Sequence, residues 1–255
     1  MEKSIKKIGA QLYTVREYMK TPKDIAETFN KVRKIGYEVV QFSGAPIGDA
    51  KELRKMADDA GIRIICTHIP YADFKDNPEK VAEEHRIIGA THAGLGMMPM
   101  KLFRDGEGAA EFAKDFDKIA KALKNEGIGT TYHNHRMEFQ RVGGKTVMEI
   151  MLENSERFTL MLDTFWVQSG GADPVDFIRK HKNRIELIHF KDMQIIGNEQ
   201  HMSEVMEGNL NWNGIINEVL DSDIEYAFVE QDICRRDPFE SLEISYNNLK
   251  SFLEG

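Results

Sequence analysis

The chain has 255 residues, of which 41% are hydrophobic, so it can bury one large core in a single domain. Its 34 basic and 42 acidic side chains leave a formal net charge of -8, which disfavours a nucleic-acid partner. Cys66 and Cys234 form no CxxC pair, and no apolar run approaches the roughly 20 residues of a membrane span. The charged residues 1–7 precede an apolar stretch too short for a signal peptide. We therefore expect a soluble, cytoplasmic protein with no membrane partner.

Short apolar runs alternate with longer amphipathic stretches along the whole chain. Strands are expected near residues 7–13, 37–42, 62–68, 91–96, 128–134, 158–163, 185–190 and 225–230. Thr21-Pro22 and Asp173-Pro174 each place a capping residue before a proline, which is typical of a helix start. Helical spacing of apolar residues is clearest in three sets: Ile25, Phe29 and Val32; Phe112, Phe116, Ile119 and Leu123; Leu242, Tyr246, Leu249 and Leu253. Eight strands separated by helices predict an α/β fold, a single (β/α)8 TIM barrel over residues 1–255.

Four of the expected strands end in side chains that bind metals or transfer protons. The C-terminal ends of parallel barrel strands open at one mouth, so these side chains are expected to converge there. Two imidazoles and two carboxylates suit one divalent cation. Taken singly, each residue has a simpler explanation, such as a helix cap or an exposed strand end. Their joint placement on separate strands favours a metal site made of His133, Asp163, His189 and Glu230.

Side chains alternate along a strand, so His133 and His135 share one face of the fifth strand. The same alternation groups His189 with Lys191. It also groups Glu230 with Asp232 around the predicted metal site. The remaining polar or sulfur-containing candidates have no partner motif and are expected to be structural, exposed or part of a pocket wall: His85, His92, His181, His201, Met97, Met98 and Met100.

The order of these strand-end motifs resembles the sugar phosphate isomerase/epimerase family, which has the xylose isomerase-like TIM barrel. The resemblance extends over essentially the whole chain and rests on QLYTVR at 11–16, THIPY at 67–71, YHNH at 132–135, LDT at 162–164, HFKD at 189–192, GNLNW at 208–212 and VE at 229–230. It implies one divalent metal ion, Mn, Co, Mg or Zn, at the ends of strands five to eight. Asp163, His189 and Glu230 match the ligands of strands six, seven and eight.

The fifth strand departs from the pattern of many relatives, which carry a glutamate that is both ligand and acid/base. His133 stands at that position here, so one carboxylate of a symmetrical two-carboxylate epimerase is missing. His135 matches the histidine that dehydratase-like members use as acid/base. Glu138 is a spare carboxylate nearby, and we expect it to be a solvated loop charge rather than a ligand.

The resemblance implies a metal-dependent isomerase or epimerase that acts on a small sugar or other polyhydroxy carbonyl compound through an enediolate. Glu230 or His135 is the expected base, and His68, Arg16 and Lys191 are the expected substrate-binding residues. The alternative is an inosose-type dehydratase acting on a cyclitol. A DNA-repair endonuclease of the related barrel type fits poorly, because it needs a three-zinc cluster and a basic face, and a non-catalytic sugar-binding protein needs no full ligand set. The sequence leaves open the choice of reaction, the exact substrate and whether it is phosphorylated. It also leaves open the metal, whether His133 or Glu138 completes the metal site, and whether the protein forms a homo-oligomer.

Overall fold

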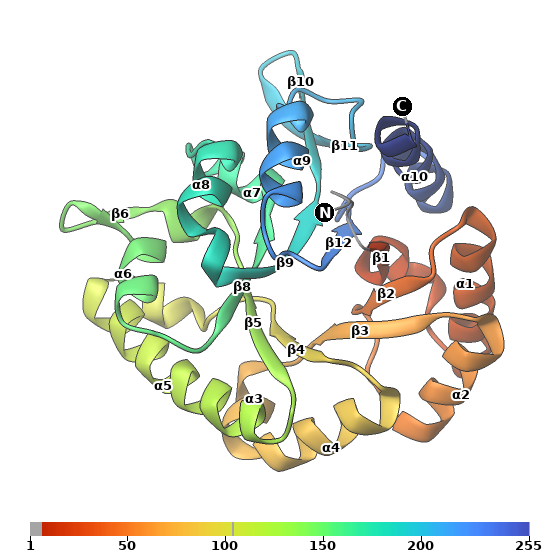
Figure 1. Ribbon diagram of the computed structural model, residues 1–255, viewed down its shortest axis with the longest axis horizontal. Coiled ribbons are helices and arrows are strands. Elements are labelled where there is room, and N and C mark those ends of the chain that lie inside the picture. Colours follow the sequence, from red (N-terminus) through yellow and green to blue (C-terminus); the bar gives the residue numbers. More distant parts are fainter. Residues whose placement is uncertain (1–6, 104, 255) are drawn as a thin grey trace.

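Eight parallel strands close into a barrel, with helices around the outside (Figure 1). The computed structural model describes residues 7–103 and 105–254, so the charged N-terminal residues 1–6 lie outside the described part of the chain. Around the barrel the strands follow the order β1, β2, β3, β4, β5, β8, β9, β12 and back to β1. The expected (β/α)8 barrel is therefore confirmed. No helix in the described ranges is both long and apolar enough to cross a membrane.

All eight expected strands are present, and their ends lie within two residues of the expected ones. The barrel strands are β1 (Lys7–Gln11), β2 (Val39–Phe42), β3 (Arg63–His68), β4 (His92–Leu95), β5 (Gly129–His133), β8 (Thr159–Asp163), β9 (Ile185–Phe190) and β12 (Tyr226–Val229). The first strand is shorter than expected. It ends at Gln11 because the Gln11 side chain accepts a hydrogen bond from the backbone N–H of Tyr13 and starts a 3-10 helix there.

The helices that connect the strands bury the apolar faces predicted by their spacing. They are α1 (Pro22–Ile35), α2 (Ala50–Ala60), α3 (Tyr71–Asp76), α4 (Pro78–Ile88), α5 (Gly106–Asn125), α6 (Val147–Glu153), α7 (Thr164–Ser169), α8 (Pro174–His181), α9 (Trp212–Leu220) and α10 (Pro238–Glu254). Short 3-10 helices add η1 (Leu12–Tyr18), η2 (Met100–Phe103), η3 (Arg136–Phe139) and η4 (Lys182–Arg184). Thr21 and Asp173 cap α1 and α8 as expected.

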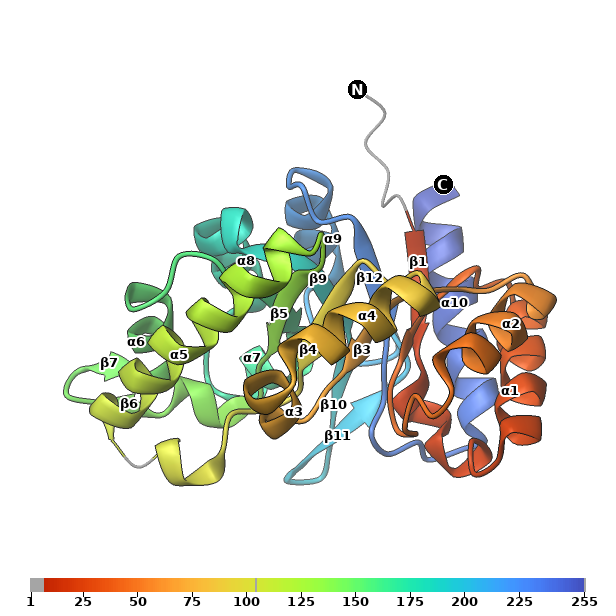
Figure 2. The ribbon, with the colours of Figure 1, turned by 90° about the horizontal axis from the view of Figure 1, so that it is seen from below.

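Two hairpins extend the loops that follow the barrel strands. One pairs β6 (Arg141–Val142) with β7 (Lys145–Thr146), and the other pairs β10 (Asp192–Ile196) with β11 (Glu199–Ser203). Figure 2 shows the β10–β11 hairpin at the end of the barrel opposite to the start of β1. This end carries the C-terminal ends of all the barrel strands, and we call it the barrel mouth.

An apolar layer fills the barrel directly beneath the predicted metal ligands. Its buried side chains are Val39, Ile65, Cys66, Met161, Leu187, Tyr226 and Phe228. Met161, Leu187 and Phe228 each precede a predicted ligand by two positions, so they share its inward face. Gly9 makes room for this layer, since a Cβ atom there would lie 2.6 Å from the Phe228 ring. The polar side chains at the mouth therefore pack directly on a buried apolar layer.

Asp192, at the start of β10, holds the long loop before α9 against the barrel mouth. Its carboxylate accepts hydrogen bonds from the indole Nε1 of Trp212, at 2.6 Å, and from backbone N–H groups of four residues: Met193, Met206, Gly208 and Leu210. Asp192 is the last residue of the HFKD motif, and Gly208, Leu210 and Trp212 belong to the GNLNW motif. The two motifs are therefore joined by these hydrogen bonds.

We expect Asp192→Asn to destabilise the fold, because the new amide group turns N–H donors toward N–H donors. Leaving one or two buried donors unpaired costs about 1–3 kcal/mol each in the free energy of unfolding. Urea denaturation followed by tryptophan fluorescence measures this loss. Asp237→Asn is the matched control, since Asp237 accepts from the backbone of Phe239 and Glu240 at an exposed helix start. An equally small change in both variants contradicts the structural role of Asp192.

Candidate metal centre

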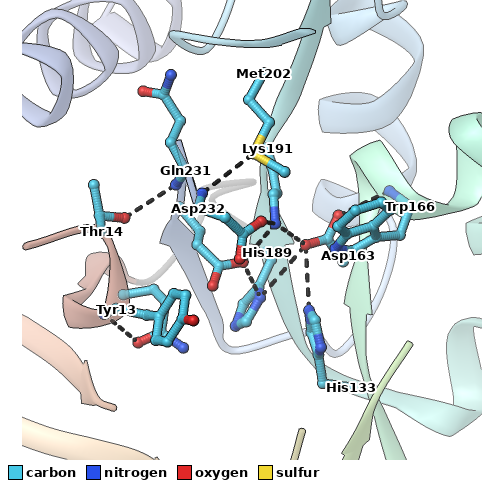
Figure 3. Close-up of polar contacts among 12 residues, drawn as sticks. Tyr13, Thr14, His133, Asp163, Trp166, His189, Lys191, Met202, Gln231 and Asp232 are labelled. Carbon is cyan, nitrogen blue, oxygen red and sulfur yellow. Dashed lines mark hydrogen bonds and ion pairs between the residues drawn. The ribbon is translucent and has the colours of Figure 1, made fainter. Parts of the chain in front are cut away.

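The four predicted ligands meet at the barrel mouth, each at the end of a different strand. Each of His133, Asp163, His189 and Glu230 offers a ligand atom, and these atoms all lie within 4.8 Å of one another. Their side chains are almost completely buried, with exposed fractions from 0% to 4%. Figure 3 shows His133, Asp163 and His189 pointing toward one point. The barrel thus brings together the side chains that the sequence placed on separate strands.

The two histidines are oriented so that each turns one ring nitrogen toward this point and holds the other in a hydrogen bond with a neighbour. His133 Nδ1 lies 3.3 Å from the carbonyl oxygen of Gly96, which accepts only, so Nδ1 carries the proton and Nε2 faces Asp163. His189 Nε2 donates to the side-chain oxygen of Gln41 at 2.7 Å, which leaves Nδ1 facing Glu230 and Asp163. Fixing the far nitrogen in this way is the usual preparation of a metal-binding histidine.

Asp163 uses its two carboxylate oxygens for different purposes. Oδ1 accepts from the backbone N–H of Trp166 and caps α7, whereas Oδ2 lies 3.2 Å from His133 Nε2. The side chain of Asn134, which points away from His133, accepts a hydrogen bond from the Asp163 backbone N–H at 2.9 Å. Asp163 is therefore both a helix cap and a predicted ligand. Its backbone is fixed by the neighbouring strand.

Lys191 lies among the acidic side chains of the centre and is completely buried. Its ammonium nitrogen is 3.4 Å from Asp163 Oδ2 and 3.2 Å from Glu230 Oε2, and it also contacts the carboxylate of Asp232 (Figure 3). Its positive charge lies between carboxylates that would otherwise repel one another. The substrate-binding role expected for Lys191 from the sequence stays a prediction.

The charged side chains of this cluster shift one another's pKa values. Burial opposes protonation of His189, but the nearby carboxylates of Glu230 and Asp163 outweigh it and raise its pKa to about 9. Burial likewise disfavours the ionised form of Glu230, yet Lys191 and His189 hold its pKa well below the ordinary value. Without a metal ion the cluster is therefore held together by protons and by Lys191. A divalent cation can replace the proton on His189.

A cavity of about 400 Å³ opens onto the centre, and we call it the first cavity. Glu230, His133 and His135 line it, together with Tyr13 and His68. The His135 ring lies edge-on to the His133 ring, with the ring centroids 4.8 Å apart. In the described part of the chain, His135 Nδ1 and His68 Nε2 have no hydrogen-bond partner. Both nitrogens are buried and, among the described residues, unpartnered beside this cavity.

His135 is a neutral imidazole near neutral pH. Burial, with a smaller contribution from His133, lowers the pKa of His135 to about 3. Its ring is therefore unprotonated throughout the neutral range, and the low pKa also makes it a weak base in the metal-free centre. This protonation state is the one that a general base requires.

Glu138 is not the solvated loop charge that was expected. It is completely buried, and it accepts hydrogen bonds from the Tyr132 hydroxyl at 2.6 Å and from the backbone N–H of His135 at 2.8 Å. The Tyr132 oxygen in turn accepts from the backbone of Met98. Burial raises the pKa of Glu138 to about 7. The carboxylate faces these partners and positions the His135 segment.

Arg16 does not line the first cavity. Its guanidinium group donates to the backbone oxygen of Tyr13 at 2.8 Å and lies over the Tyr13 ring, 4.2 Å from the centroid. Tyr13, which sequence analysis did not single out, is the residue that reaches the cavity. Gln41 was missed as well, because an amide at the end of an ordinary strand carries no signal until His189 is placed beside it.

The other histidines were expected to be structural or exposed, and His85 illustrates this role. It is completely buried, with Nε2 2.8 Å from the Thr67 hydroxyl and Nδ1 2.6 Å from the Val81 backbone oxygen. Met98 is buried and Met97 lines the first cavity, as expected for packing and pocket-wall residues.

Comparison with known proteins agrees with this geometry. Inosose dehydratase from Clostridium tetani is 25% identical over 176 residues, and inosose dehydratase from Bacillus cereus is 24% identical over 178 residues; each match covers 58% of this chain and 58% of the relative. The matched region thus spans a little over half the length of these relatives.

Solved structures match over nearly the whole chain. A sugar phosphate isomerase/epimerase from Parabacteroides distasonis superimposes with a TM-score of 0.81 and 25% identity, over 98% of this chain and 96% of that one. An L-ribulose 3-epimerase shares the fold, with a TM-score of 0.71 and 15% identity over 97% of this chain and 94% of that one. The model of the xylose isomerase-like TIM barrel family matches residues 29–238. The resemblance seen in the sequence is thereby confirmed, and the chain belongs to the xylose isomerase-like TIM barrel family.

Proposed function

We propose that the protein is a metal-dependent isomerase or epimerase of a small polyhydroxy carbonyl compound. The observation that carries this proposal is the buried set of two imidazoles and two carboxylates beside a cavity that also contains a neutral, unpartnered histidine. Membership of the xylose isomerase-like family and the similarity to a sugar phosphate isomerase/epimerase support it. Such a set serves proton transfer next to a carbonyl group.

The donor set fits one divalent metal ion. His133 and His189 each turn one ring nitrogen inward, and Asp163 and Glu230 each turn one carboxylate oxygen inward. In the metal-free centre the inward nitrogen of His189 carries a proton near neutral pH, which a metal ion would displace. Nitrogen and oxygen donors of this kind suit Mn, Co, Mg or Zn. A bound ion would supply positive charge that lowers the pKa of a proton beside a carbonyl group of the substrate.

His135 is the residue best placed to take that proton. Its ring borders the first cavity, its Nδ1 has no partner in the described part of the chain, and it is neutral at neutral pH. Glu230 is ionised and lines the same cavity, although Lys191 and His189 already contact it. We assign proton transfer to His135, with Glu230 as ligand and second acid/base. His68 and Tyr13 are left to bind substrate hydroxyl groups.

A dehydratase of an inosose-like cyclic ketone is the second candidate. The similarity to two inosose dehydratases favours it, and so does the presence of His133 where a symmetrical epimerase would have a second carboxylate. Both reactions begin with the same proton removal. They differ in whether the proton returns to carbon or a hydroxyl group leaves.

Separate roles for the two histidines of the fifth strand give the first test of this proposal. His133→Ala is expected to weaken metal binding, because it removes one of four ligands. His135→Ala should keep the metal and lower turnover by about 10²–10⁴-fold, the usual effect of removing an acid/base. Elemental analysis and activity on a panel of ketoses and inososes measure the two effects. Equal metal loss in both variants, or in neither, contradicts the assignment.

Exchange with solvent identifies the reaction. In deuterated water, a substrate should take up deuterium during isomerisation or epimerisation, or lose a hydroxyl group in the dehydratase reaction. Glu230→Gln is expected to abolish the exchange, because the amide cannot supply the negative charge that the centre needs. Nuclear magnetic resonance of the products detects all three outcomes. Full exchange by the Glu230→Gln variant excludes a role for this carboxylate.

Replacement of Lys191 tests the charge balance of the centre. Near pH 7 the metal-free Lys191→Met variant should lose about 3–5 kcal/mol in the free energy of unfolding, because buried carboxylates lose their counter-charge. Lys191 lowers the folded-state pKa of Asp163 and Glu230, so its stabilisation is present above the ordinary carboxyl pKa and declines as the pH falls below it. The loss should therefore be smaller at pH 4 than at pH 7.

Addition of Mn²⁺ extends this test. The ion should raise the melting temperature of Lys191→Met more than that of the unchanged protein, since it replaces the missing ammonium charge. Lys180→Met is the control, because Lys180 forms an exposed ion pair with Glu149 and its loss should change stability by about 0–1 kcal/mol. A loss at Lys191 that is independent of both pH and Mn²⁺ argues for simple packing.

A further inference from the structure

A second cavity of about 470 Å³ lies at the barrel mouth beside the first one. Its lining comes from four segments: the start of η3, α7, β11 of the β10–β11 hairpin and the loop after β12. None of its lining residues is a predicted metal ligand or a predicted catalytic residue. The proposed reaction therefore leaves this cavity without a role.

Only a thin wall separates the two cavities. On one side the ring of His135, which lines the first cavity, lies 5.3 Å from the ring of Trp166, which lines the second. On the other side Asp232 lines the first cavity, and its backbone N–H contacts the sulfur of Met202, at 3.2 Å, in the lining of the second. The two cavities are therefore adjacent, with these side chains between them.

Two of the residues that line the second cavity carry positive charges without a partner in the described ranges. Arg136 and Arg235 both line it, are exposed, and make no hydrogen bond or ion pair with any residue in the described ranges. Most other exposed arginines of the chain differ in this respect; Arg236, for example, lies 3.3 Å from Glu204. His201 and Glu199 also line the cavity, and they contact each other. In a protein of net charge -8, two unpaired arginines at one opening favour an anion.

The rest of the lining is aromatic and apolar. Phe165, Trp166 and Ile233 contribute to it, and Ile233 is one of the most exposed large apolar side chains of the described chain, at 70%. The indole Nε1 of Trp166 is buried and has no hydrogen-bond partner among the described residues. Such a surface suits a flat ring, because indole and phenyl groups stack on rings of similar width.

We propose that the second cavity binds a negatively charged ring, which forms the far part of the substrate whose polyhydroxy carbonyl part occupies the first cavity. The ring lies against Trp166, and its phosphate or carboxylate group lies between Arg136 and Arg235. That the bound ring belongs to the substrate rests on the function proposed above. The binding of an anionic ring can be measured without metal and without turnover.

Trp166 provides the signal for this measurement, because the second tryptophan, Trp212, is buried against Asp192. Phenyl phosphate is titrated into EDTA-treated protein, since a metal ion in the first cavity would bind phosphate by itself. We expect a saturable change in fluorescence that disappears in Trp166→Phe. Inorganic phosphate, which has the charge but no ring, and phenol, which has the ring but no charge, should each bind at least tenfold more weakly.

Charge variants decide the assignment. The double variant Arg136→Gln/Arg235→Gln should weaken phenyl phosphate binding at least tenfold and leave phenol binding within twofold. Arg236→Gln, the same change at the next position but outside this cavity, should leave both unchanged. No saturable signal, equal affinity in the double variant, or an equal loss in Arg236→Gln overturns the proposal. Failure of the exchange reaction refutes the proposed function alone, because phenyl phosphate binding does not depend on it.

Discussion

The barrel mouth depends on one buried positive charge, the ammonium group of Lys191. Three carboxylates contact it, and two of them, Asp163 and Glu230, are also predicted metal ligands. Carboxylates buried this close to one another would repel strongly or take up protons if no cation lay between them. The third, Asp232, reaches the wall between the two cavities through Met202. The same lysine therefore sets the geometry of the predicted metal centre and stabilises the loop that divides the mouth.

The histidines of the centre are positioned by elements that contribute no ligand. Gly96, in the loop after β4, fixes His133, and Gln41, at the end of β2, fixes His189. Each contact fixes the orientation of a ring. Gly96 follows β4, the neighbour of β5, whereas Gln41 lies on β2, which is not a neighbour of β9. A closed barrel makes such contacts possible, because side chains of strands that are not neighbours, such as β2 and β9, meet in one interior. Most of the barrel thus contributes to the site, although only four strands supply ligands.

The fold and the clustering of the four predicted ligands could be predicted from the sequence because both follow from local patterns. Strand spacing gave the barrel, and alternation along a strand placed His189 with Lys191 and His133 with His135 on the inward face. Contacts between segments distant in the sequence could not be predicted in this way. Glu138 was expected in solvent, since nothing near it in the sequence shows that Tyr132 turns a hydroxyl group toward it. Lys191 was assigned to the correct face, but its burial depends on three carboxylates from other strands and loops.

The presence of His133 in place of a carboxylate changes the net charge of the predicted ligand set. With His133, the ligands carry two negative charges, from Asp163 and Glu230, which one divalent cation would balance. Lys191 and Asp232 then form a neutral pair beside the centre. A centre without excess negative charge does not raise the proton affinity of a nearby imidazole, and burial keeps His135 neutral. We therefore propose that the substitution on the fifth strand and a role of His135 as base belong together, because His133 stands where a carboxylate could have acted as base and the neutral imidazole of His135 lies two residues later.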